Sequence, residues 1–379
     1  MRTQVRRFAL LLSLAPAVAF SREPSPRPFV RVREGQFVIG AKPYHFLGVN
    51  LWFGMNLGAA DRSRLIRELD RLQQLGVTNI RLMAASEGPS TEPFRVTPAV
   101  QNAPGEFNEP LLQGLDFLLA EMAKRDMRGV LVLNNFFQWS GGMAQYVNWA
   151  TGDPIPYPEQ NGHTWDEFQN YSARFYVTEK AEAQYERYVA ALIGRRNTVT
   201  GVAYRDDPTI MSWQVSNEPR GFAYSDAYVN WVDRIGAFIR NRAPNQLISL
   251  GGEGKLDRHT PGTGTQFERV SRSPFLDYLT IHLWIENWGW YDPSHPDATW
   301  DVALGRSMSY LADHVSIAQA LHKPLVLEEF GVSRDGRAYD PAAPVTHRDH
   351  FLTTVLEALY YLASEPTVVA GGNVWSWSG

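Results

Sequence analysis

Two apolar runs, well separated in the chain, each lead into a glutamate: IMSWQVSNEP at Ile210–Pro219 and PLVLEEFG at Pro324–Gly331. An apolar run of this length is typical of a buried strand, and each run places its carboxylate at the strand's carboxyl end. In a parallel barrel, the carboxyl ends of all strands open at one shared mouth. The two runs therefore predict a parallel α/β barrel in which two carboxylates meet.

Glu218 and Glu329 are the carboxylates that these runs present. Two such groups suit glycoside hydrolysis, because one donates a proton to the leaving oxygen while the other attacks the anomeric carbon or activates water there. The alternative is that both are strand-end residues in surface loops, paired with nearby arginines. Asn-Glu-Pro after one strand and Glu-Phe-Gly after another together favour the catalytic interpretation. By strand alternation, Glu328 is expected to face the helices, and a register slip would exchange it with Glu329.

The rest of the chain alternates strands with helices. Expected strands are 45–49, 77–82, 129–134, 209–215, 247–250, 276–282, 324–329 and 368–375. Expected helices are 62–75, 109–125, 179–195, 226–242, 301–321 and 346–362, with a short one at 268–271. Eight strands in this alternation favour a (β/α)8 TIM barrel, since a doubly wound open sheet would need a reversal of strand order that the sequence does not reveal.

Both ends of the expected barrel have features of their own. A small hairpin of 29–32 and 36–39, turning at Glu34-Gly35, is expected to close the bottom of the barrel. The chain stops at Gly379, just past the eighth strand, so the last helix is apparently absent. Apolar barrel wall is then expected to be exposed unless it is covered in another way. We expect 29–379 to form one catalytic domain.

The N-terminal residues are typical of an export signal. Three arginines precede an apolar stretch at 8–20, and Ala17-Val18-Ala19 offers small residues for cleavage. The stretch is too short to span a bilayer, and Pro16 disfavours the alternative of a buried N-terminal helix. We expect 1–19 to be a signal peptide and 20–28 a Pro-rich tether, in a secreted or periplasmic protein.

Composition argues against several classes of function. A formal charge of −4 gives no basic field for nucleic acid, and the absence of Cys excludes disulfides, thiolate metal sites and cysteine catalysis. The 12 Trp and 16 Tyr suit stacking against sugar faces, although large proteins also bury many aromatic residues. No lysine ends an expected strand, which disfavours Schiff-base chemistry. His347 and His350 have no third ligand placed with them, so no metal or cofactor is expected.

The order of these motifs resembles glycoside hydrolase family 5, over residues 29–379. The matching segments are Asn79-Ile80-Arg81-Leu82, Asn217-Glu218-Pro219, Thr280-Ile281-His282-Leu283-Trp284, Glu329-Phe330-Gly331 and Asn373-Val374-Trp375. Three further segments look like the bacterial β-mannanase branch, whose members hydrolyse β-1,4-mannosidic bonds: Gly48-Val49-Asn50, the run at 133–142, and Trp288-Gly289-Trp290-Tyr291. The resemblance implies a retaining enzyme with Glu218 as acid/base and Glu329 as nucleophile.

Physical arguments support these roles. Glu218 must hold a proton near neutral pH, which needs partial desolvation and a nearby carboxylate such as Glu329. Arg81 is placed to donate a charge-assisted hydrogen bond that keeps Glu329 ionised, although another strand-end carboxylate could be its partner. Asn217 can bond the sugar 2-hydroxyl unless it only caps its loop. His282 can bond a carboxylate or the sugar, or be purely structural.

Further candidates for binding sugar are mostly aromatic: Trp139, Trp284, Trp288, Trp290 and Trp375, with Asn135 and Glu253 as weaker ones. Trp375 is expected to form the floor of the subsite for the scissile sugar. The family often has a tyrosine where this chain has Trp284, whose indole donates a hydrogen bond and accepts none. The three tryptophans at 139, 288 and 290 could stack along a sugar chain or merely pack loops together.

These expectations converge on hydrolysis of mannan or mannooligosaccharides by double displacement, with an endo-1,4-β-mannanase as the leading interpretation. A retaining mechanism needs carboxyl groups about 5 to 5.5 Å apart, whereas an inverting one needs about 6.5 to 9.5 Å. The alternatives are a β-1,4-glucan hydrolase of the same family, an exo-acting β-mannosidase, and a noncatalytic carbohydrate-binding barrel. We expect a monomer that binds no nucleic acid and, after signal cleavage, no membrane.

Overall fold

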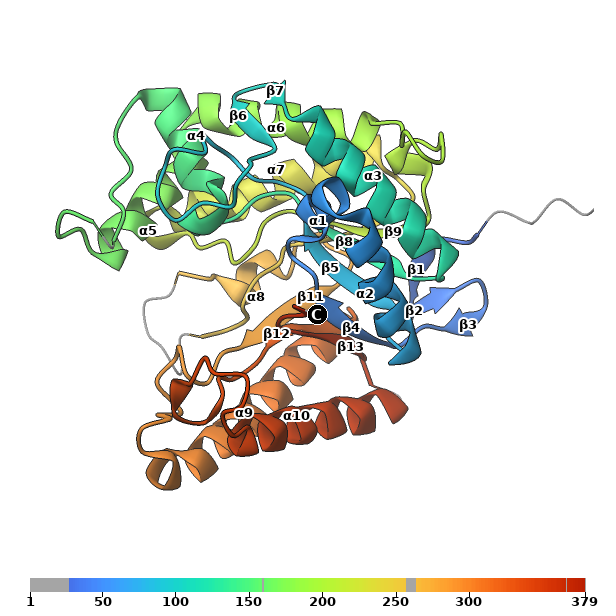
Figure 1. Cartoon of the computed structure of the whole chain (residues 1–379), viewed down its shortest axis with the longest axis vertical. Helices are drawn as coiled ribbons and strands as arrows, with labels where there is room; N and C mark the ends of the chain where they lie inside the picture. The colour runs from blue at the N-terminus through green and yellow to red at the C-terminus, as the bar shows by residue number, and fades with distance from the viewer. Residues whose placement is uncertain (1–26, 159, 257–263, 366, 379) are drawn as a thin grey trace, which may run out of the picture.

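Eight parallel strands curve into a barrel (Figure 1). The computed structural model describes residues 27–158, 160–256, 264–365 and 367–378. The strands follow one another in the order β10, β9, β8, β5, β4, β13, β12, β11. Their bounds are β4 Phe46–Asn50, β5 Asn79–Met83, β8 Arg128–Val132, β9 Ile210–Gln214, β10 Leu247–Ser249, β11 Leu279–Leu283, β12 Leu325–Phe330 and β13 Val369–Val374. This arrangement confirms the predicted (β/α)8 TIM barrel.

The barrel closes between β10 and β11 through scattered hydrogen bonds rather than a ladder. The Thr280 hydroxyl donates to the Gly252 carbonyl at 3.1 Å. The His282 amide donates to the Glu253 carbonyl at 3.1 Å. This seam therefore ends at the mouth of the barrel, beside His282 and Glu253.

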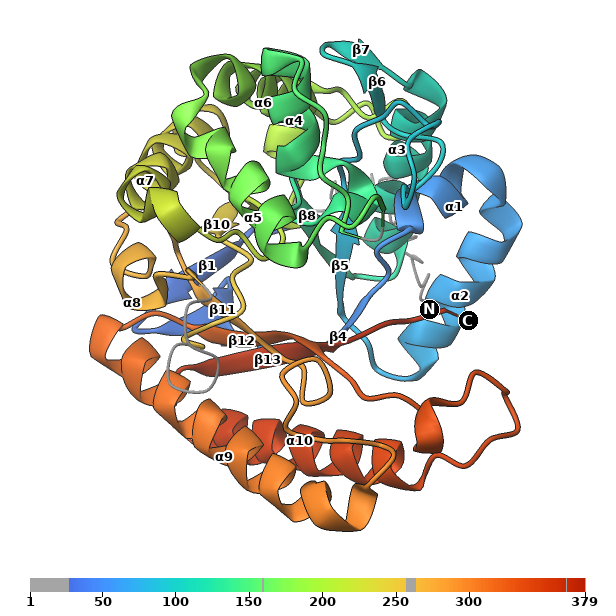
Figure 2. The same ribbon diagram turned by 90° about the vertical axis from the view of Figure 1, so that its left-hand side faces the viewer.

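Helices cover the outside of the barrel. Their bounds are α1 Gly54–Ala60, α2 Arg62–Gln74, α3 Glu109–Lys124, α4 Gly142–Thr151, α5 Trp165–Ala173, α6 Glu179–Gly194, α7 Ser225–Arg242, α8 Phe267–Val270, α9 Pro296–Leu321 and α10 Thr346–Ser364. Figure 2 shows α9 and α10 together beneath β12 and β13, with α4 and α6 on the opposite side. All seven expected helices are present, with ends within a few residues of the predicted ones.

Helices α1, α4 and α5 and a small hairpin of β6 (Gln101–Ala103) and β7 (Glu106–Phe107) were not predicted. Helix α1 contains Gly54 and Gly58, and α4 begins at Gly142. Glycine lowers helix propensity, so the local sequence of these two segments does not indicate a helix. Packing overrides propensity here, since α4 buries Met143, Tyr146 and other side chains against the core.

The predicted N-terminal hairpin closes the bottom of the barrel. Strands β1 (Val30–Arg33) and β2 (Gln36–Ile39) pair antiparallel, and β3 (Lys42–Pro43) extends them. Val30 and Phe37 pack with side chains from the barrel strands: Phe46, Met211, Leu247, Val326 and Ala370, together with Tyr278. The predicted signal peptide 1–19 and most of the tether 20–28 lie outside the described residues. Within the described ranges, no helix is long and apolar enough to cross a membrane.

The described chain ends in an extended segment, and in this part no helix follows β13. The Trp377 amide donates to the Asn50 carbonyl at 3.0 Å, and its indole donates to Glu68 of α2 at 2.9 Å. Beside β4, an apolar groove of about 360 Å³ remains, lined by His45, Phe46, Leu47, Leu356, Leu359, Tyr360, Ala363, Gly371 and Gly372. The expected exposure of apolar barrel wall is found at this groove, where Leu47 is 38% exposed.

Helices α1 and α3 touch through their glycines. A β-carbon on Gly114 would lie 2.4 Å from the Met55 carbonyl oxygen, and one on Gly58 would lie 2.3 Å from the Gly114 carbonyl oxygen. Backbones this close leave no room for a side chain. The contact therefore fixes α1, which directly follows β4, against its neighbour.

Gly114→Ala is expected to destabilise the protein by about 1–3 kcal/mol, because the added methyl must push two helix backbones apart. Gly305→Ala in α9 is the matched control, since a β-carbon there meets nothing within 4 Å and alanine favours a helix by about 1 kcal/mol. Thermal unfolding followed by circular dichroism should show a lower Tm than wild type for Gly114→Ala and an equal or higher Tm for Gly305→Ala. A Gly114→Ala protein with the Tm of wild type would refute the close contact.

Candidate active site

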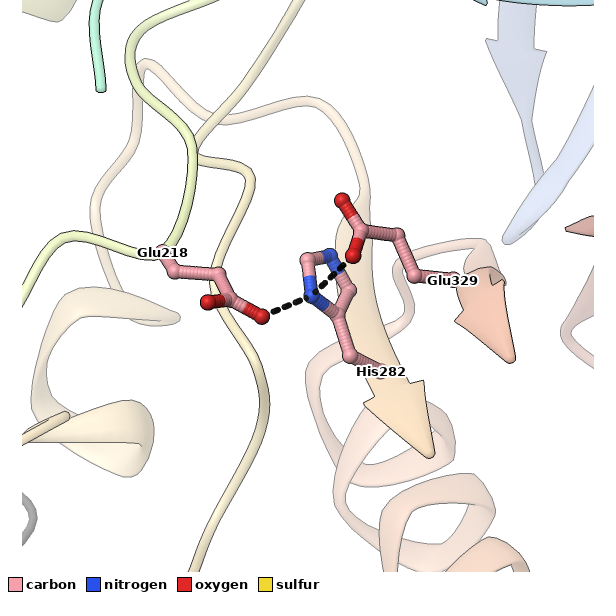
Figure 3. A group of neighbouring side chains, drawn as sticks. All are labelled: Glu218, His282 and Glu329. Carbon is pink, nitrogen blue, oxygen red and sulfur yellow. Dashed lines mark hydrogen bonds and ion pairs between the residues drawn. The ribbon is translucent and has the colours of Figure 1, made fainter. Parts of the chain in front are cut away.

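Glu218 and Glu329 point into the same space at the carboxyl ends of β9 and β12 (Figure 3). His282 of β11 lies between them, with Nδ1 2.6 Å from Glu218 Oε1 and 3.4 Å from Glu329 Oε2. One oxygen of each glutamate and one ring nitrogen of His282 all lie within 4.8 Å of one another. This closeness agrees with the shorter carboxyl separation, about 5 to 5.5 Å, that a retaining mechanism uses.

Backbone contacts hold Glu218 at the mouth. Its amide donates to the Gly251 carbonyl at 2.8 Å, and the amide of Asn217 donates to the Asn134 carbonyl at 2.9 Å. The backbone at Glu218 is left-handed, with φ 48°, an uncommon conformation for a residue with a side chain. Such strain persists only where surrounding contacts fix it, and it is frequent at functional sites.

Burial sets the protonation of the three groups. It raises the pKa of Glu218 to about 6, against the opposing charges of Arg220 and Arg81. It lowers the pKa of His282 to about 4, so this imidazole is neutral near pH 7. Burial also raises the pKa of Glu329, while His282 and Arg81 oppose that shift. The cause at Glu218 is thus desolvation more than the neighbouring carboxylate.

Arg81 contacts Glu329, as predicted. Its Nη1 donates to Glu329 Oε1 in a short contact and to Asn50 Oδ1 at 3.0 Å. Nη2 donates to Asn217 Oδ1 at 2.7 Å, and Nε donates to Gln214 Oε1 at 2.7 Å. Arg81 is only 2% exposed and does not line the main cavity. It therefore acts on substrate through Glu329 and Asn217 rather than by contact.

The prediction that Glu328 faces the helices is wrong. In the β11–β12 ladder, Ile281 pairs with Leu327, but the next residue, His282, pairs with Glu329. Glu328 is therefore an extra residue in a β-bulge, which breaks the alternation of side chains. Both Glu328 and Glu329 consequently point inward, and Glu328 lies deeper, against Gln214.

A cavity of about 700 Å³ opens above these groups. Eight of the predicted residues line it: Trp139, Asn217, Glu218, Glu253, Trp284, Trp288, Glu329 and Trp375. Trp284 and Trp375 meet edge to face, with ring centroids 6.0 Å apart. Apolar faces beside carboxylates are suited to sugar rings, which have both apolar faces and hydroxyl edges.

Two other residues that were predicted to bind sugar, Trp290 and Asn135, do not line the cavity. Trp290 is 2% exposed and packs against Trp288 and Tyr310, so its prediction as a stacking platform is wrong. Asn135 is fully buried and accepts a hydrogen bond from Asn217 Nδ2 at 3.2 Å. It orients Asn217 and does not line the cavity.

Several cavity residues were not predicted: Phe137, Trp165, Gln169, Arg220, Leu256 and Asn287. Arg220 is the most informative, because its Nε donates to Glu253 at 2.7 Å and its Nη1 to Gln169 at 2.8 Å. Burial raises the pKa of Glu253 to about 7, with Arg220 opposing. The sequence feature that could have identified Arg220 as a site residue is its position directly after Asn217-Glu218-Pro219. Trp165 and Gln169 belong to α5, which was not predicted.

A second cavity of about 530 Å³ adjoins the first. It is lined by Trp52, Phe94, Arg95, Val96, Trp139 and Trp375. Trp139 and Trp375 line both cavities, so the two form neighbouring parts of one cleft.

Glu218, His282 and Glu329 are also the one cluster of metal-ligand type within the described ranges. Their mutual hydrogen bond and the guanidinium of Arg81 account for their arrangement. A cation among them would lie close to the positive charge of Arg81, which disfavours it electrostatically. We interpret the cluster as acid–base groups, and the expectation of no metal or cofactor stays a prediction.

Comparison with known proteins assigns a family. Residues 27–379 match the model of a family described as "GH family 5 beta-mannosidase-like". "Mannan endo-1,4-beta-mannosidase 7" of Arabidopsis thaliana is 31% identical over 363 residues, covering 92% of this chain and 77% of that protein.

Solved structures agree with this match. A "Glycoside Hydrolase Family 5 Mannosidase" from Rhizomucor miehei superposes with a TM-score of 0.86 at 38% identity, covering 93% of this chain and 86% of that one. An "Endo-1,4-beta-mannanase" from Rhizomucor miehei gives a TM-score of 0.67 at 23% identity, over 92% and 90% of the two chains. The second likeness shows the shared fold.

Proposed function

We propose that this chain, which belongs to the β-mannosidase-like group of glycoside hydrolase family 5, hydrolyses β-1,4-mannosidic bonds in mannan or mannooligosaccharides. The observation that carries the proposal is the convergence of Glu218 and Glu329 on one cavity, with oxygens within 4.8 Å of each other. The names of similar proteins support the choice of mannan.

The proposed mechanism is double displacement with retention. Glu218 donates its proton to the glycosidic oxygen while a Glu329 oxygen attacks the anomeric carbon, so the aglycone leaves and a glycosyl ester forms. Glu218, now a carboxylate, then takes a proton from water, which attacks the same carbon and releases Glu329. A pKa of about 6 lets Glu218 serve as the acid and then as the base.

Neighbouring groups support each role. The Arg81 guanidinium favours the ionised form of Glu329 that attack requires. Neutral His282 can donate to a carboxylate or accept from a carboxyl through Nδ1, so it suits both states of Glu218. Asn217, held by Arg81 and Asn135, is available to the sugar 2-hydroxyl.

The rival substrate within the family is β-1,4-glucan, because the catalytic residues would be the same and only the 2-hydroxyl differs in orientation. The relatives' names favour mannose, and the position of Asn217 offers a contact to that hydroxyl. A noncatalytic sugar-binding barrel is disfavoured by the buried acid–base arrangement, which sugar binding alone does not need.

Endo action is the better fit to the cleft. In the proposed mechanism the leaving group lies on the side of the acid/base Glu218, where Arg220 and Glu253 also line the cavity, and we place the other part of the substrate over Trp375. The second cavity continues past Trp375 and Trp139, which leaves room for further sugars there. An exo-acting β-mannosidase would need that side closed.

We also propose that the protein is exported from the cell. The arginines and apolar stretch of the first residues support export to a secreted or periplasmic site, where polysaccharide would be met. We propose a monomer in which one chain supplies every residue named at the cleft.

Glu218→Gln and Glu329→Gln are expected to lower kcat on mannooligosaccharides by at least about a hundred- to ten-thousandfold, since each removes a reacting group. An aryl β-mannoside with a good leaving group needs no protonation, so it should restore the first step in the first variant only, seen as a burst of released aryl alcohol, while hydrolysis of the glycosyl ester stays slow without the Glu218 base. Rates on both substrates would be measured with Glu268→Gln, an exposed partner of Lys255, as control. Equal losses on the aryl mannoside would contradict the division of roles.

Mannohexaose should be cut internally, because sugars can occupy the cleft on both sides of Trp375. Early products analysed by chromatography should be mannobiose to mannotetraose. Early release of mannose with mannopentaose would instead indicate exo action.

The choice of mannan over glucan is tested by comparing the rates of hydrolysis of the two polymers. Faster hydrolysis of carboxymethyl-cellulose than of mannan would reject the proposed substrate.

A further inference from the structure

Glu328 is a fully buried carboxyl group that the mechanism does not use. It is 0% exposed and does not line either cavity of the cleft. It faces into the barrel like Val326 two residues earlier, against Gln214, and the β-bulge lets its neighbour Glu329 face inward as well. There it lies near the same guanidinium as the nucleophile, with Arg81 Nε 3.5 Å from Glu328 Oε2.

Glu328 has few partners suited to an anion. In the described part of the chain, its hydrogen-bond donor is one amide group, Gln214 Nε2, at 2.8 and 2.7 Å from its two oxygens. Arg81 Nε is nearby, but that N–H donates to Gln214 Oε1. The other Arg81 nitrogens donate to Glu329, Asn50 and Asn217. Among the residues that the structure describes, no charge-assisted hydrogen bond therefore reaches the Glu328 carboxyl group.

Asp116 shows how the same protein holds a buried carboxylate that is ionised. It is also 0% exposed, yet it accepts hydrogen bonds from two Arg195 nitrogens at 2.9 and 2.6 Å. The hydroxyls of Tyr204 and Thr198 donate to it at 2.6 and 2.8 Å. These contacts hold the pKa of Asp116 below its usual range despite burial, whereas burial raises the pKa of Glu328 to about 7.

We propose that Glu328 carries a proton in the working enzyme and thereby leaves the charge of Arg81 to Glu329. Glu328 is thus a positioning residue, and this role rests on the proposed function of Glu329 as nucleophile. The groups with charge or a titratable proton that face it are Arg81 from β5, Glu329 on its own strand and Tyr278 ahead of β11.

Ionisation of Glu328 would weaken the contact between Arg81 and Glu329. A second anion beside Arg81 competes for the guanidinium and repels Glu329. Because Arg81 also holds Asn217, a shift toward Glu328 would displace both the nucleophile and the contact proposed for the 2-hydroxyl. The enzyme would then lose activity above neutral pH for a reason additional to deprotonation of Glu218.

Infrared difference spectroscopy on the full-length mature protein tests the protonation state without using activity. The spectrum of wild type minus Glu328→Gln at pH 6 should show the C=O stretching band of a protonated carboxylic acid, which disappears as the pH rises. Wild type minus Asp116→Asn is the matched control and should show ionised carboxylate bands. Carboxylate bands in the Glu328 difference spectrum would overturn the proposal, even if the protein proves to be an active mannanase.

Kinetics test the functional consequence. Glu328→Gln mimics the protonated form, so kcat/KM below pH 6 should stay within about threefold of wild type and fall less steeply at alkaline pH. Glu328→Ala, which leaves Gln214 and Arg81 unsupported, should lose about tenfold or more across the whole range. A tenfold loss at all pH values in the Gln variant, or its failure to fold, would show that the negative charge is needed and contradict the proposal.

Discussion

The mouth of this barrel depends on one buried guanidinium. Arg81 of β5 donates to Glu329, Asn217, Gln214 and Asn50, so a single side chain joins four strands or their ends at one point. A charge that is 2% exposed is tolerated only where an anion and oriented dipoles surround it. The position of the nucleophile and of the amide beside the acid/base therefore follows from the same set of hydrogen bonds.

The regular strands bring the catalytic residues together, and local irregularities in the backbone orient their side chains. The parallel strands bring distant segments to one rim, which is why Glu218 and Glu329 can share a cavity. Two irregularities then aim the side chains: a left-handed backbone at Glu218 and the β-bulge at Glu328. The loops add the walls, with Trp139 and Trp375 common to both parts of the cleft.

The sequence predicted the parts of this structure that periodicity and strand-end chemistry determine. The strands, the covering helices, the hairpin and the contact of Arg81 with Glu329 follow from local patterns. The direction of Glu328 did not, because a bulge depends on pairing with β11 and leaves no mark in its own strand. The burial of Trp290 and the approach of Arg220 to Glu253 likewise depend on how loops pack, which local patterns do not encode.

Trapping the covalent intermediate tests the central claim most directly. A 2-deoxy-2-fluoro-β-mannosyl fluoride has a good leaving group, and its fluorine slows hydrolysis of the glycosyl ester, so the labelled enzyme accumulates. Digestion and peptide mass spectrometry should find one mannosyl label, on Glu329, which points into the cavity beside Glu218. A label on Glu328, or turnover of the reagent with no labelled peptide, would contradict the account.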